Sequence, residues 1–155
     1  MDLHEGRLGI PLLDDDGTLD LLAAARRIAV IGASANPGRP SHGVLHQLRA
    51  AGYEMVPVNP NETNVDGLVC YPDLATAVLA TGPVDIVDVF RRSDQCVAHA
   101  REAVAVGAHC LWLQLGVVSR EAGRIALEGG LAIVMDRCTI IEYGRLVRGR
   151  TDRPA

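Results

Sequence analysis

The sequence predicts an α/β fold, a doubly wound, mostly parallel sheet with helices on both faces. Apolar runs of strand length alternate with helical patterns at short spacing, which is typical of parallel βαβ units with right-handed crossovers. The composition agrees, because 48% of the residues are hydrophobic but only 3% are aromatic, so the core must be aliphatic. The 155 residues suit one domain, in which about residues 20–147 carry the fold and residues 1–16 and 148–155 are peripheral.

The stretch from residue 27 to residue 41 is the first βα unit of this fold. An apolar strand over 27–31 ends at Gly32, small and turn-forming residues follow, and a helical pattern starts near Ser41. In such a unit the N–H groups of the loop and the positive end of the helix form an anion site. We therefore expect this loop to bind the phosphates of a nucleotide-containing cofactor.

The other elements follow from N-cap residues, glycine stops and β-branched runs. Before the first strand, Thr18 is the expected N-cap of a short helix over 19–26, and the acidic run 14–16 should be solvated. We expect further strands over 54–58, 84–90, 109–115 and 131–135, and a short extended segment over 65–71. The expected helices span 41–51, 73–79, 93–106, 119–128 and 138–144. Asp73, Ser93 and Ser119 are the expected N-caps of the second, third and fourth of these helices.

Charge and cysteine content exclude several classes of partner. The formal net charge of −4 gives no overall attraction to nucleic acid or to an anionic membrane, so local groups must bind any anionic ligand. We see neither a signal peptide nor an apolar run long enough to span a bilayer. The four cysteines include no CxxC pair, which favours a cytoplasmic protein with reduced thiols. His42 and His46 share a helix face, but without a third ligand we expect no metal site.

The strand ends argue against a nicotinamide or flavin dinucleotide. The GxGxxG motif is absent, since Ser34 occupies the place of its second glycine, and the end of the second strand (58–60) lacks the carboxylate that would bind a ribose 2′-hydroxyl. Instead, Arg39 lies in the first loop and Arg91 follows another strand. Ligands of open parallel sheets bind at this carboxyl edge, where arginine can bind phosphate with two hydrogen bonds.

Polar residues within apolar runs also need an explanation. Asp88 lies in the β run 84–90 and therefore needs a buried hydrogen-bond partner, which favours a structural role over a catalytic one. Gln114 shares a strand face with Trp112 and should lie nearer to the ligand edge. Cys138 follows the last strand, next to Arg137, and is either a packed side chain or a thiol that reacts with the ligand.

Six motifs within about residues 20–147 carry a family resemblance. They are VIGAS (30–34), NPGRPSHGV (36–44), GYEMVPVNPN (52–61), VDIVDVFRRS (84–93), LWLQLGV (111–117) and GLAIVMDRCTIIEYGRL (130–146). Together they resemble the stand-alone CoA-binding domain proteins, whose Rossmann-like fold is similar to that of the CoA-binding domain of the succinyl-CoA synthetase α subunit. The resemblance implies that coenzyme A binds along the carboxyl edge of the sheet.

The resemblance also implies which residues contact the cofactor. They are Gly32, Ala33 and Ser34 at the pyrophosphate, Pro37 in the same loop, Arg39 at a phosphate, Ser41 at the helix start, Asn59 and Pro60 beside the adenosine, Val89, Phe90 and Arg91 along the next wall, and Gln114 and Gly116 near the pantetheine arm.

Three functions stay open at this point. The favoured one is non-catalytic binding of CoA or an acyl-CoA. The second is a component of a CoA-dependent ligase or transferase. Such a component would need a partner, because the chain is too short for the nucleotide-grasping domain of the ligase relatives and none of its five histidines matches their phosphohistidine segment. The third, an NAD(H)-binding redox sensor, is disfavoured by the missing ribose carboxylate. We expect no complete catalytic activity from the chain alone, and homo-oligomers and partner proteins remain open.

Overall fold

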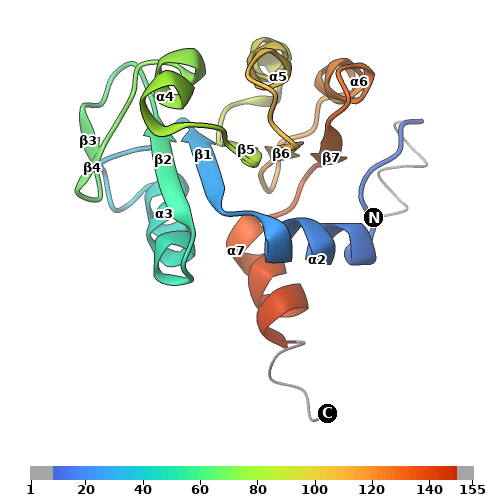
Figure 1. The fold of residues 1–155 in the computed structure, drawn as a ribbon, viewed down its shortest axis with the longest axis horizontal. Helices are drawn as coiled ribbons and strands as arrows, with labels where there is room; N and C mark the ends of the chain where they lie inside the picture. The colour runs from blue at the N-terminus through green and yellow to red at the C-terminus, as the bar shows by residue number, and fades with distance from the viewer. Residues whose placement is uncertain (1–8, 150–155) are drawn as a thin grey trace.

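Five parallel strands form the central sheet in the computed structural model, which describes residues 9–149 (Figure 1). Their order is β2-β1-β5-β6-β7, and every neighbouring pair is parallel. The predicted fold class is therefore confirmed. The bounds of the strands are Arg27–Ile31 for β1, Glu54–Val58 for β2, Ile86–Val89 for β5, Cys110–Leu113 for β6 and Ala132–Val134 for β7.

Helices cover both faces of the sheet, as predicted, and Figure 1 shows one layer of them above the strands and another below. Side chains alternate along each strand, so Ala29 and Ile31 pack into the upper core while Ile28 and Val30 pack into the lower one. The upper helices are α4 (Leu74–Thr81), α5 (Cys96–Ala105) and α6 (Arg120–Glu128), and the lower ones are α2 (Asp15–Ala24), α3 (Pro40–Ala50) and α7 (Thr139–Glu142), which continues as π-helical turns over Tyr143–Arg148.

The predicted extended segment over 65–71 is a small antiparallel hairpin. It consists of β3 (Asn64–Val65) and β4 (Leu68–Val69), outside the main sheet. Asp66 and Gly67 form its turn with φ values of 53° and 78°. Asp-Gly is a common pair in two-residue hairpin turns, because both positions require positive φ.

The start of the described chain differs from the prediction. Helix α2 begins at Asp15, and Asp14 is its N-cap, with a carboxylate oxygen that accepts a hydrogen bond from the Gly17 N–H at 2.8 Å. Thr18 is not the cap but is buried inside the helix. The acidic run forms the first turn because carboxylates stabilise the positive end of a helix. Ile10 and Leu12, in the stretch expected to be peripheral, are buried in the core. Of the predicted peripheral ends, 1–16 and 148–155, residues 1–8 and 150–155 lie outside the described residues.

Two of the other three predicted N-caps are confirmed. Asp73 accepts a hydrogen bond from the Thr76 N–H at 2.7 Å, and Ser119 accepts one from the Ala122 N–H at 3.1 Å. Ser93 instead begins a short 3₁₀ turn, and its hydroxyl oxygen accepts a hydrogen bond from the Val118 N–H at 3.0 Å. This bond connects the loops after β5 and β6, so the serine serves a long-range contact rather than a helix end.

The strand order places a crevice at one edge of the sheet. After β1 the chain turns to α3 on the lower face, and after β5 it turns to α5 on the upper face (Figure 1). Because β1 and β5 are neighbours, their carboxyl ends separate into opposite layers and leave a switch point between them. The candidate site lies there.

A candidate ligand groove at the carboxyl edge of the sheet

A groove of about 720 Å³ opens at this switch point. It is lined by residues that follow the carboxyl ends of all five parallel strands and by the first turn of α3. Nine of the thirteen residues predicted to contact a ligand line this groove: Gly32, Ser34, Arg39, Ser41, Asn59, Phe90, Arg91, Gln114 and Gly116.

The other four predicted residues lie beside the groove lining. Ala33 and Val89 are fully buried in the two cores, so their side chains face the sheet interior. Pro37 and Pro60 are exposed in their loops. Any contact of these four residues with a ligand remains a prediction.

Gly32 ends β1 in a conformation that favours glycine. Its φ is +85°, and an added Cβ would lie 2.6 Å from the carbonyl oxygen of Phe90 and 3.3 Å from Nε of Arg91. The missing side chain thus lets the end of β5 approach the loop and lets Arg91 lie over it. The Gly32 and Ala33 N–H groups both donate to the Val58 carbonyl, at 2.9 and 3.4 Å. These two amides therefore hold the turn against β2 in this structure.

The first turn of α3 is the more available anion-binding group. Arg39 is at the N-cap position without a side-chain capping bond, and Pro40 is the first helical residue. The leading N–H groups of a helix have no partner within the helix, and its dipole adds positive potential there. Because Pro40 and Ser41 line the groove, this positive end borders the cavity.

Two arginines add positive charge to the same cavity. Within residues 9–149, neither Arg39 nor Arg91 forms an ion pair or a side-chain hydrogen bond, whereas the Nε of Arg92 lies 3.4 Å from Oδ1 of Asp94. A guanidinium without a counter-charge that borders a cavity suits a phosphate, which it can bind through two parallel hydrogen bonds. The groove therefore carries local positive charge despite the negative charge of the whole chain.

The loop after β1 is held by side chains from its own residues and from the β2 side. The Asn59 Nδ2 donates to the Ala33 carbonyl at 2.8 Å, which ties the two loops together. Glu62, from the loop after β2, accepts a hydrogen bond from the Ala35 N–H at 2.6 Å. No sequence pattern pointed to Glu62 at this site, because the contact joins two loops that meet only in the folded sheet.

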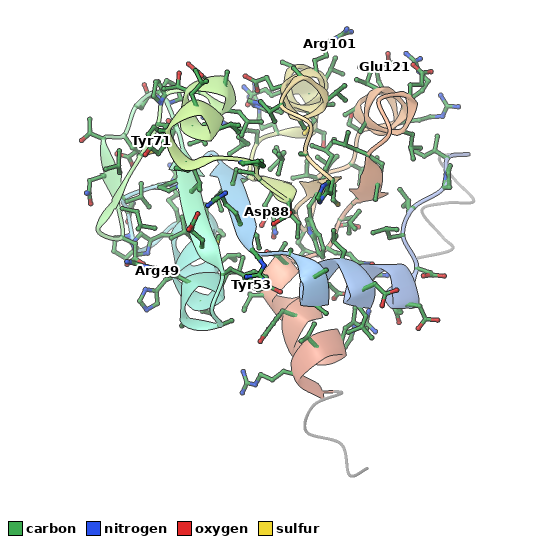
Figure 2. The ribbon with its side chains drawn as sticks, in the orientation of Figure 1. Arg49, Tyr53, Tyr71, Asp88, Arg101 and Glu121 are labelled. Atoms are coloured by element: carbon green, nitrogen blue, oxygen red, sulfur yellow. The ribbon has the colours of Figure 1, made fainter. Side chains whose placement is uncertain are left out.

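A buried polar cluster forms the floor of the groove. Asp88, fully buried at the centre of the sheet (Figure 2), accepts hydrogen bonds from Gln114 Nε2 at 2.7 Å and from the Thr139 hydroxyl at 2.9 Å. The Gln114 Nε2 also donates to the Thr139 hydroxyl oxygen at 3.0 Å. The predicted buried partners of Asp88 are thus present. Burial raises the pKa of Asp88 to about 7, although both hydrogen bonds act to lower it. The cluster fixes the Gln114 amide, so that its remaining polar atom is an acceptor.

The β6–β7 end of the groove is apolar, and sequence reasoning missed most of it. Leu115, Val117 and Ile141 line this end, together with Cys138. Leu115 is 64% exposed and Ile141 is 56% exposed, so this end of the groove presents apolar side chains to solvent. The position of these residues could have indicated the apolar end, because residues 115–117 follow β6 and Cys138 lies between β7 and α7, at the carboxyl edge of the sheet.

Neither a metal site nor a membrane-spanning helix is found among the described residues. His46 Nδ1 lies 3.0 Å from a carboxylate oxygen of Asp66 on the β3–β4 turn, away from the groove. Within residues 9–149, no three histidine, cysteine or acidic side chains gather as a metal site would require. No helix in that part of the chain combines the length and apolar character needed to cross a membrane.

Comparisons with known proteins agree with this geometry. The sequence model of the CoA binding domain matches residues 26–144. Over 124 residues the chain is 40% identical to the uncharacterized protein YneT of Bacillus subtilis (strain 168), a match that covers 80% of this chain and 90% of YneT. The solved structure of a hypothetical protein from Pyrococcus horikoshii OT3 is 33% identical, with a TM-score of 0.82 over 87% of this chain and 93% of that one. A dinucleotide-forming acetyl-coenzyme A synthetase 1 of Ca. Korarchaeum cryptofilum shares the fold, with 22% identity and a TM-score of 0.63 over 71% of this chain and 26% of the synthetase.

Proposed function

This chain belongs to the CoA-binding domain family, and on that premise we propose that it binds coenzyme A or an acyl-CoA in the groove at the carboxyl edge, without catalysing a reaction by itself. The observation that carries this proposal is the convergence of three positive groups on one cavity. The guanidinium groups of Arg39 and Arg91, which have no ion-pair partner among the described residues, border the same groove of about 720 Å³ as the uncapped start of α3. Coenzyme A carries a pyrophosphate and a ribose 3′-phosphate, which supply the matching charge.

The polarity of the lining supports one orientation of the ligand. Ser34, Arg39 and Asn59 lie at the β1–β2 end, whereas Leu115, Val117 and Ile141 lie at the β6–β7 end. The phosphorylated adenosine therefore belongs at the first end. The pantetheine arm then extends past Gln114 and Gly116, and the thiol lies near Cys138.

The same lining favours binding over catalysis. Among the described residues, those that line the groove include no histidine and no carboxylate, which are the usual proton-transfer groups of enzymes. Asp88 lies beneath the surface with both carboxylate oxygens engaged. A ligase or transferase reaction at this groove would need such groups from a partner protein. All four cysteines are free, which supports a cytoplasmic location for the binding protein.

Titration calorimetry with coenzyme A, dephospho-CoA and NAD tests the proposal. We expect affinity to decrease in that order, because each step removes the 3′-phosphate or the pantetheine arm from a groove that would contact both. Tightest binding of NAD would contradict the proposal. Binding of coenzyme A that is unchanged by added salt would also contradict it, because charge pairs at an exposed edge are screened.

A further inference from the structure

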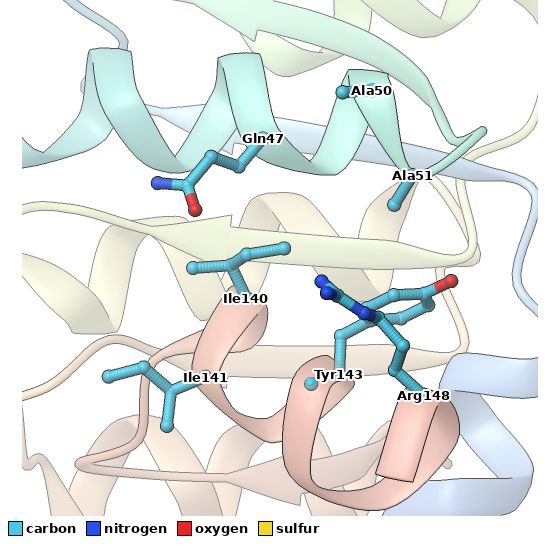
Figure 3. Close-up of a pocket in the computed structure, with 8 residues that line it drawn as sticks. Gln47, Ala50, Ala51, Ile140, Ile141, Tyr143 and Arg148 are labelled. Carbon is cyan, nitrogen blue, oxygen red and sulfur yellow. The ribbon is translucent and has the colours of Figure 1, made fainter. Parts of the chain in front are cut away.

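A second cavity, of about 490 Å³, adjoins the groove on the lower face of the sheet. It lies between the C-terminal half of α3 and the π-helical turns that follow α7 (Figure 3). Ile141 lines both cavities, so the two are adjacent at this one side chain. The other residues that line it are Gln47, Ala50, Ala51, Ile140, Tyr143, Gly144 and Arg148.

Two helices define a path from the groove to this cavity. Helix α3 begins beside the groove at Pro40 and reaches the second cavity at Ala50, and the segment from Cys138 to Arg148 leads from one cavity to the other in the same direction. The two helices are in contact. From Ile141 to Arg148 the path is at most about 10 Å long, taking the rise of an α-helix as the upper limit.

We infer that the second cavity holds the aliphatic acyl chain of an acyl-CoA whose thioester lies beside Cys138 and Ile141. This inference rests on the proposed function and specifies its ligand. The thiol end of the ligand lies at the apolar end of the groove, and Ile141 borders both that end and the second cavity, which is lined mainly by alanine, isoleucine, tyrosine and glycine. A path of about 10 Å accommodates roughly eight carbons, since each C–C bond of about 1.5 Å advances an extended chain by about 1.3 Å.

Gly144 lies within the π-helical turns and lines the cavity. A Cβ added to this glycine would have no heavy atom within 4 Å, and its backbone is helical, so the position is open but not strained. Such turns are rare and often occur at functional sites. A larger side chain at position 144 should therefore fill the cavity without disturbing the fold.

Calorimetry with coenzyme A and with its butanoyl, hexanoyl and octanoyl thioesters tests the inference. Full burial of a methylene is worth about fourfold in Kd, and because one side of the cavity is open we expect roughly a twofold decrease in Kd per methylene from butanoyl to octanoyl. Gly144→Leu should abolish this gain, whereas Gly144→Ala, which adds little volume, should retain it. Ala50→Leu fills the same cavity from the opposite wall and should act like Gly144→Leu.

The outcomes separate this inference from the proposed function. If coenzyme A binds but chain length has no effect on Kd, the inference is overturned while the proposed function stands. If both filling variants retain the gain in affinity, the acyl chain lies elsewhere and the inference fails. If none of the four compounds binds, the proposed function is wrong and the inference falls with it.

Discussion

Replacement of Asp88 by asparagine should change how the free energy of unfolding depends on pH. The pKa of Asp88 is raised from 3.8 to about 7, chiefly by burial. Between about pH 4 and pH 7 the folded protein therefore keeps a proton that the unfolded chain loses. Because the folded state binds more protons in this window, the contribution of Asp88 to stability falls as the pH rises through it and is lost above about pH 7.

The size of this effect follows from the two pKa values. A difference of about three units corresponds to ~4 kcal/mol at the upper limit, and relaxation around the charged carboxylate reduces it to about 2–4 kcal/mol. Asparagine has the shape of the protonated acid and can still accept from Gln114 while its amide donates to the Thr139 oxygen. The variant should therefore lack this contribution to the pH dependence.

Urea denaturation at intervals from pH 4.5 to pH 8.5 measures this difference. We expect the free energy of unfolding of the unmodified protein, minus that of Asp88→Asn, to fall by about 2–4 kcal/mol from the low end of the range to the high end. Subtraction removes the titration of groups that are common to both proteins. A difference that stays flat, or rises with pH, would refute the assignment of a buried carboxyl group whose pKa in the folded protein is raised to about 7.

Two further predictions concern the charges around the groove. Arg39→Ala should weaken the binding of coenzyme A by about 1.5–3 kcal/mol, the value of a charge-assisted hydrogen bond, and should weaken the binding of dephospho-CoA less. Calorimetry measures both losses, with Arg49→Ala as the control for net charge. Equal losses for the two ligands would show that Arg39 does not contact the 3′-phosphate. Glu62→Gln should lower the Kd for coenzyme A about threefold at low salt, because repulsion between a carboxylate and a phosphate roughly 7 Å apart costs ~0.6 kcal/mol in water. Glutamine can still accept the hydrogen bond from the Ala35 N–H, so the loop should keep its conformation. An unchanged or weaker Kd would show that no phosphate lies near this loop.

Local patterns in the chain predicted the strands well. β1 and β2 have the predicted bounds, because each is an apolar run whose end is set by a nearby glycine or proline. The later strands are one or two residues shorter at each end than predicted. The start of α2 was predicted wrongly, since aspartate and threonine both occur as N-caps and the structure places Asp14 at the cap and buries Thr18.

The sequence by itself determined the alternating strands and helices, the small-residue loop at Gly32 and the gathering of Arg39 and Arg91 at one edge, since these depend on local propensity and on the rule that parallel strands end together. Only the tertiary structure decided that Val58 engages the Gly32 and Ala33 amides, that Glu62 reaches the same loop, and that Ile141 joins the groove to a second cavity. Each of these contacts joins segments far apart in the chain. Their geometry follows from how the helices pack on the sheet, which no short stretch of residues encodes.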